Sequence, residues 1–268
     1  MLFKVTEVRM ISQTISLFRY LLLGFLNRRL LLFMVTPALL ALTIGALVSE
    51  LAIINAGAVA AGLVADVMRY SLVLMMILLV STAVAEDFEF RQFERLLTMP
   101  LARWQYVVAQ SWVVAVIALL LAIPCLIMVT LFSDWALGLY WATALWLELL
   151  LIGLLALLAA LSLEKVTSSV LLTLACYLLA KLSGLISRML AESVSLSSGS
   201  ITSRFGDAIF SGILYVIPDI DSFANNNVFF AQLDLIAMLL NQFYSVLIYA
   251  LFLLVISLVD FYRKEFNF

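Results

Sequence analysis

The 268-residue sequence has no histidine, two cysteines and four prolines, and only 12% of its residues are charged. Without histidine, the chain has no Ser-His triad, no HExxH zinc site and no histidine ligand for haem. Both cysteines, Cys125 and Cys176, lie in apolar runs, so we expect buried thiols and no disulfide framework. The net charge of -2 gives no indication of a nucleic-acid partner.

Apolar residues are what the sequence has in excess, at 66% of the chain. An average soluble domain has about half its residues apolar and about a quarter charged. This excess is too large for one soluble core, so the composition predicts an integral membrane protein. Because the first apolar run follows a stretch that carries charges throughout, we expect no cleavable signal peptide.

Long apolar runs predict six transmembrane helices, each near the ~20 apolar residues that cross a bilayer core. The expected spans cover residues 30–52, 69–86, 104–132, 139–163, 169–187 and 241–260. The intervening residues 57–69, which include Asp66 and Arg69, either extend the second span or form an outer surface segment.

Two further segments complete the expected all-α membrane fold. Residues 7–27 predict an N-terminal amphipathic interface helix, with the first helix of a soluble cap as the alternative. Its apolar stripe comprises Val8, Ile11, Ile15, Phe18, Leu22 and Phe25. Before the last span, a short apolar run broken at Pro218 predicts an outer re-entrant or interfacial helical hairpin.

The distribution of basic residues predicts the orientation of the chain. With both termini cytoplasmic, all of the 15 basic residues lie inside except Arg69, Lys181, Arg188 and Arg204. We therefore expect a multi-pass protein of a cell inner membrane. Its parts are a cytoplasmic N-terminal helix (1–29), five spans (30–187), an extracytoplasmic section (188–240), and the sixth span with a cytoplasmic tail (241–268).

The longest polar interruption in the first half of the chain is the segment 86–103, which we call the elbow. Phe90, Phe93 and Leu97 fall on one helical stripe, which predicts a short helix along the cytoplasmic surface that ends before Pro100. A plain charged loop between two spans is the alternative. Arg103 is expected at the interface, where such residues anchor spans.

The elbow resembles the permeases of type-2 ABC exporters. Between their second and third spans these carry an acidic start, a short helix ending in Leu-Leu, two residues, a proline, and a small residue followed by arginine. The matching residues here are Glu86, Glu94, Leu96-Leu97, Thr98-Met99, Pro100 and Ala102-Arg103. The order of spans, the segment from Pro218 to Phe223 and the ending FYRKEF are similar too. Two positions depart from the pattern, Arg91-Gln92 in place of Gly-Thr and Gln110 in place of a frequent lysine.

The resemblance implies a transport subunit that is not itself an enzyme. It implies an ABC ATPase partner that docks on Phe90, Phe93, Glu94, Leu97 and Arg103, and a second copy of the chain or a similar permease. The sequence has no GxxxxGK[ST] motif, so we expect no cofactor on this chain, with ATP-Mg on the ATPase. Membrane lipids and a periplasmic protein are further expected contacts, and the substrate is expected to be hydrophobic or amphipathic.

Glu148 and Lys181 form a second candidate site, an intramembrane ion pair. They lie at similar distances from the short connection between the expected fourth and fifth spans, so their depths in a bilayer should match. An unpaired charge there would cost several kcal/mol, which favours a mutual pair. The pair would act either as a packing clamp or as part of a substrate path.

Two other functions are compatible with the composition. One is a membrane scaffold or assembly factor without an ATPase, which would not require the elbow. The other is an intramembrane enzyme acting on lipids, which the absence of histidine and of a clustered cytoplasmic Asp motif disfavours.

Overall fold

The computed structural model describes residues 16–25, 35–51, 55–89, 103–194, 229 and 235–263. Nearly all residues in these ranges are helical, and none of them lies in a β-strand. The main helices are α2 (Val35–Leu51), α3 (Ala56–Glu89), α5 (Arg103–Thr130), α6 (Trp135–Leu163), α7 (Val166–Val194) and α9 (Leu235–Arg263). The four helices α3, α5, α6 and α9 are long and apolar enough to cross a membrane, and α2 and the apolar part of α7 are shorter. The chain is therefore an all-α protein built for membrane embedding.

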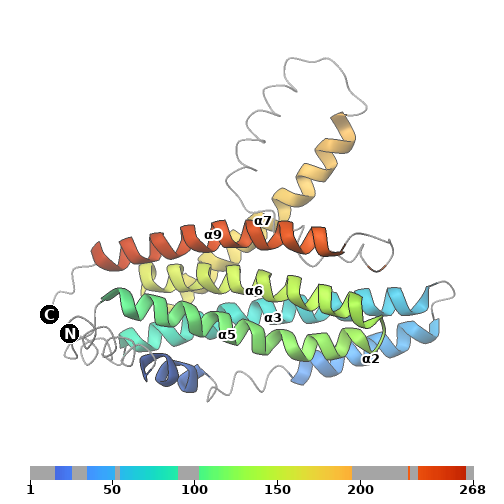
Figure 1. The fold of residues 1–268 in the computed structure, drawn as a ribbon, viewed down its shortest axis with the longest axis horizontal. Helices are drawn as coiled ribbons and strands as arrows, with labels where there is room; N and C mark the ends of the chain where they lie inside the picture. Colours follow the sequence, from blue (N-terminus) through green and yellow to red (C-terminus); the bar gives the residue numbers. More distant parts are fainter. Residues whose placement is uncertain are drawn as a thin grey trace, which may run out of the picture.

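Helix α6 is the centre of the bundle. It packs against α3, α5, α7 and α9, and Figure 1 shows α3, α5, α6 and α9 running along the long axis while α7 runs obliquely to them. Of the most apolar stretch of α6, 78% is buried, against 17% for α9. A helix hydrophobic on every face is expected at such a central place.

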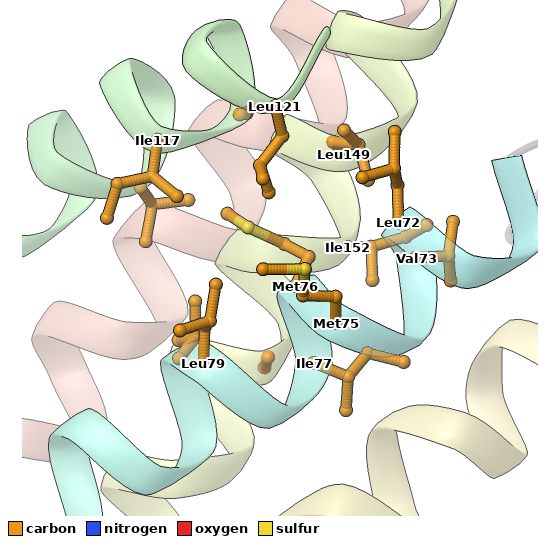
Figure 2. Packing of buried hydrophobic residues seen from close by; sticks show 14 of the residues in the cluster. Leu72, Val73, Met75, Met76, Ile77, Leu79, Ile117, Leu121, Leu149 and Ile152 are labelled. Carbon is orange, nitrogen blue, oxygen red and sulfur yellow. The ribbon is translucent and has the colours of Figure 1, made fainter. Parts of the chain in front are cut away.

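Close packing around α6 depends on Gly153. A Cβ at this position would lie 2.6 Å from Met76 Cε of α3 and 2.6 Å from Val114 Cγ1 of α5. In Figure 2, Met76 points into the space between Leu121 of α5 and Ile152 of α6. Small residues let helix backbones approach closely, which is how helices associate when lipid is the solvent.

The helix α3 is one continuous helix of 34 residues. It includes residues 57–69, so the reading in which they extend the second span is correct for the local structure. Ala61, Ala65 and Met68 in this part are fully buried in the bundle. At a rise of 1.5 Å per residue α3 is about 51 Å long, which exceeds the ~30 Å hydrocarbon core of a bilayer.

The N-terminal helix is described from Ser16 to Phe25. Its buried row is Leu17, Leu21 and Phe25, which belongs to the main hydrophobic core. The predicted stripe is thus correct at Phe25. Its other two positions in this range, Phe18 and Leu22, are only half-buried at the edge of the contact, and the residues one position earlier in the sequence are buried instead. The helix packs on the bundle through this row, and residues 7–15 of the expected helix lie outside the described part.

The connection between α6 and α7 is short, and α7 is longer than the span predicted there. Glu164 adopts a left-handed conformation (φ 57°) and its N–H donates to the Ala160 carbonyl, which ends α6 and turns the chain into α7 within two residues. The helix α7 then continues to Val194, past residue 187 where the fifth span was expected to end, and its second half leads away from the other helices in Figure 1. The predicted outer hairpin at Pro218 lies outside the described residues.

Candidate functional site

A buried ion pair joins α3 to α6. Arg69 Nε donates to Glu148 Oε2 at 2.7 Å, and Arg69 Nη2 donates to Glu148 Oε1 at 2.9 Å. The side chains are 4% and 0% exposed. Two parallel, charge-assisted hydrogen bonds from one guanidinium are a strong and geometrically specific contact.

The pair lies far from either end of the bundle. Glu148 is near the midpoint of α6, about 20 Å along the helix axis from each end. Ionised groups at the centre of a membrane helix are costly, and they persist where they pair with each other inside the bundle. Arg69 and Glu148 meet this requirement through the two hydrogen bonds.

Helix α7 completes the cluster. Tyr177 Oη donates to Glu148 Oε1 at 3.4 Å, a long hydrogen bond. Lys181, one turn further along α7, has a favourable charge–charge interaction with Glu148, and its Nζ lies 5.6 Å from the centroid of the Tyr70 ring. We call Arg69, Tyr70, Glu148, Tyr177 and Lys181 the ionic cluster.

The ionic cluster corrects the predicted pairing of Glu148 with Lys181. The depths were matched to within one helical turn, because Tyr177 of α7 reaches Glu148. The direct ionic partner of Glu148 is Arg69, because α3 packs on the face of α6 that carries the carboxylate. The sequence signal that could have identified Arg69 is its place inside the apolar run 57–86, which the boundary at residue 69 assigned to the membrane edge.

The ionic cluster connects three helices, and its guanidinium and carboxylate are almost completely shielded from solvent. Within the described ranges, no group of three or more His, Cys, Asp or Glu side chains could hold a metal ion. The contacts therefore favour the packing role that the sequence left open beside a role in a substrate path.

A second polar site ties together the helix ends that flank the elbow. Tyr106 Oη, in the first turns of α5, donates to Asp87 Oδ2 in the last turn of α3 at 2.8 Å. The Tyr106 ring stacks on Phe261 of α9, with centroids 5.8 Å apart and planes inclined by 22°. Beside it, Ser162 Oγ of α6 donates to Asp260 Oδ2 of α9 at 2.8 Å. We call these five residues the elbow base.

The elbow residues themselves are beyond what the structure describes. Phe90, Phe93, Glu94 and Leu97 lie outside the described residues. Arg103 opens α5, but its side chain is likewise outside the described part. What the structure does place is the pair of helix ends from which the elbow leaves the bundle.

One buried polar side chain has no hydrogen-bond partner. Gln110 on α5 is completely buried, and neither its Nε2 nor its Oε1 is bonded to any described group. By contrast, the buried hydroxyl groups of Ser81 and Ser169 bond to each other between α3 and α7, with their oxygens 3.0 Å apart. An unsatisfied buried amide costs free energy, so Gln110 marks a local defect in the packing of α5.

Comparison with known proteins identifies no family for this chain. No protein-family model matches the chain, and no curated protein matches it. The features of the molecule that bear on its function are the elbow motif, the elbow base and the ionic cluster.

Proposed function

We propose that this chain is the membrane permease subunit of a type-2 ABC exporter. A separate ATPase docks on the elbow at 86–103 and drives a hydrophobic or amphipathic substrate across a cell inner membrane. The observation that carries the proposal is the elbow motif, Leu96-Leu97 followed by Pro100 and Arg103, between two long apolar helices.

The elbow base supports the proposal. An ATPase that pushes on a segment between two spans needs both spans to respond together. The hydrogen bond between Tyr106 and Asp87 ties the end of α3 to the start of α5, where the elbow leaves the bundle. A displacement of the elbow would thus act on both helices at once.

The arrangement of helix ends is compatible with six crossings. The ends of α3, α6 and α9 and the start of α5 meet at the elbow base. If α2 and α7 also cross, the chain makes six passes and both termini lie on the elbow side, which the positive-inside rule assigns to the cytoplasm. Charged residues of the described helix ends gather there, including Glu86, Asp87, Lys165 and Arg263.

The bundle leaves room for lipid and for a second permease. The helix α9 exposes a row of large apolar side chains, among them Ile248, Leu251, Phe252 and Val255. A soluble monomer rarely exposes so large an apolar surface. In the proposed complex, lipid or the second permease covers it.

The experiment is co-expression of the chain with a P-loop ATPase encoded beside it, followed by purification in lipid nanodiscs. The proposal expects the ATPase to co-purify and its ATP hydrolysis to depend on the permease. The variants Phe93→Ala and Leu97→Ala should lose this dependence, while Gln92→Ala, on the opposite side of the expected elbow helix, should keep it. If no ATPase co-purifies, the proposal fails and a scaffold without an ATPase becomes the better reading.

A further inference from the structure

The elbow base contains one side chain that makes two different contacts. Tyr106 binds Asp87 through its hydroxyl and Phe261 through its ring. The hydroxyl contact links the two helix ends beside the elbow. The ring contact links the start of α5 to the end of α9, a helix that is far apart from it in the sequence.

The ring contact is sheltered from solvent, whereas the hydroxyl contact to Asp87 is partly buried. Tyr106 is 5% exposed and Phe261 is 3% exposed. A buried, stacked aromatic pair holds a defined geometry, since the rings resist sliding within a packed core. A displacement of the first turn of α5 would therefore act on the last turn of α9 through this ring contact.

Helix α9 is suited to respond to such a movement. It packs on α6 and α5 and leaves most of its surface uncovered by the described helices. Its polar contacts lie near its two ends, with Ser162 to Asp260 at the elbow side and Gln242 Nε2 to Tyr140 Oη (3.2 Å) at the far side. Between them α9 packs on α6 through apolar side chains such as Val246 and Leu253, and a helix packed in this way can shift as a rigid rod.

We infer that Tyr106 is a positioning residue that transmits movement of the elbow to α9. Its hydroxyl holds the start of α5 to the end of α3 through the hydrogen bond to Asp87, and its ring transmits a displacement of these helix ends to Phe261. This inference rests on the proposed function, because the movement is supplied by the ATPase. It adds the route by which the membrane helices receive the force and names α9 as the helix that moves.

The two contacts can be removed separately. Tyr106→Phe deletes the hydroxyl bonded to Asp87 and keeps the ring for stacking, whereas Phe261→Leu deletes the stack and keeps the hydroxyl contact. The matched control is Tyr140→Phe, which deletes a hydroxyl that contacts α9 at the end remote from the elbow. Asp87→Asn, which still accepts a hydrogen bond, should behave like the wild type, and Asp87→Ala should behave like Tyr106→Phe.

The test uses the full complex in lipid nanodiscs and three readouts. The first is binding of the ATPase, the second is stimulation of ATP hydrolysis, and the third is the distance between spin labels on α5 and α9. The labels are carried by Leu119→Cys and Val259→Cys, both exposed positions, in a background without Cys125 and Cys176.

The expected result is that Tyr106→Phe and Phe261→Leu bind the ATPase as the wild type does but lose the ATP-dependent change in label distance and the stimulation. Tyr140→Phe keeps both. If Tyr106→Phe or Asp87→Ala retains the full distance change, the inference is overturned while the proposed function stands. If the wild type binds no ATPase, the proposed function fails, and the coupling role of Tyr106 fails with it. Should Tyr106→Phe not fold, the comparison of Asp87→Asn with Asp87→Ala decides.

Discussion

Replacing Glu148 by leucine should destabilise the protein strongly. The substitution removes both hydrogen bonds that Arg69 makes to the carboxylate, at 2.7 and 2.9 Å, together with the negative charge that compensates the guanidinium. Arg69 has only 4% of its side chain exposed, so water does not replace the lost partner. Breaking a buried pair by removing one member costs about 3–5 kcal/mol. We expect a loss of this size in the free energy of unfolding.

A double variant without either charge separates the attraction between Arg69 and Glu148 from the free-energy cost of burying the two charges. Replacing Arg69 by methionine and Glu148 by leucine together removes both charges and leaves side chains of comparable volume. Such replacements are often neutral or stabilising, so the double variant should be close to the wild type. The interaction energy of the double-mutant cycle should then be several kcal/mol, well above the ~0.6 kcal/mol average for hydrogen bonds between membrane helices. Tyr177→Phe, which removes the 3.4 Å contact, should cost less than about 1 kcal/mol.

Reversible unfolding in mixed detergent micelles, followed by tryptophan fluorescence, measures these differences, since the chain has five tryptophans. Two results would refute the reasoning. One is a loss below about 1 kcal/mol for Glu148→Leu, which would mean that the pair is not shielded as described. The other is a double variant whose loss equals the sum of the two single losses, because independent sites add and coupled sites do not.

Two further predictions concern packing. Gln110→Leu should raise the free energy of unfolding by about 1–3 kcal/mol, because it removes an unsatisfied buried amide. Gln242→Leu, which breaks a hydrogen bond to α6, should lower the free energy of unfolding. The same unfolding assay measures both variants, and a loss of stability in Gln110→Leu would contradict the burial of Gln110 without a hydrogen-bond partner. Gly153→Ala places a Cβ 2.6 Å from two side-chain methyl carbons and should lower the free energy of unfolding by about 1–3 kcal/mol. The control Gly24→Ala, whose Cβ has nothing within 4 Å, should leave the free energy of unfolding unchanged. Equal unfolding midpoints for the two variants would contradict the close approach of α3, α5 and α6.

The positions of the helices follow from the sequence because lipid leaves the backbone few choices. A segment inside a bilayer must satisfy its own hydrogen bonds, so each long apolar run becomes a helix. Hydropathy has little power to locate the ends, however, and α6 begins at Trp135 and α9 at Leu235, before the residues 139 and 241 where these spans were expected to begin. The residues by which these helices start earlier, 135–138 and 235–240, are themselves apolar or small, so hydropathy alone does not mark the boundary.

For the ionic cluster, the sequence predicted the level of Glu148 along the bundle but not its ionic partner. Counting residues from a short turn predicted that Glu148 lies at a similar level to residues of α7, because the rise per residue is fixed, and Tyr177 of α7 contacts Glu148. It did not give the side of α6 to which Glu148 points, since that depends on which helices pack around it. The partner from α3 could be found only by treating 57–69 as part of the span. The same limit explains the register of the N-terminal helix, whose inward row was set by contact with the bundle.

The pairing of Arg69 with Glu148 also has a consequence for how the protein is made. The two residues are 79 positions apart, so α3 emerges from the ribosome well before its partner. At a synthesis rate of about 5–20 residues per second, the delay is about 4–16 seconds. During that time α3 carries Arg69 without its carboxylate, and each charged residue at a helix centre disfavours insertion by about 2.5–3.5 kcal/mol. We therefore expect stable integration of α3 to wait for α6, and nascent chains that end between the two helices to be those that a membrane quality-control protease recognises.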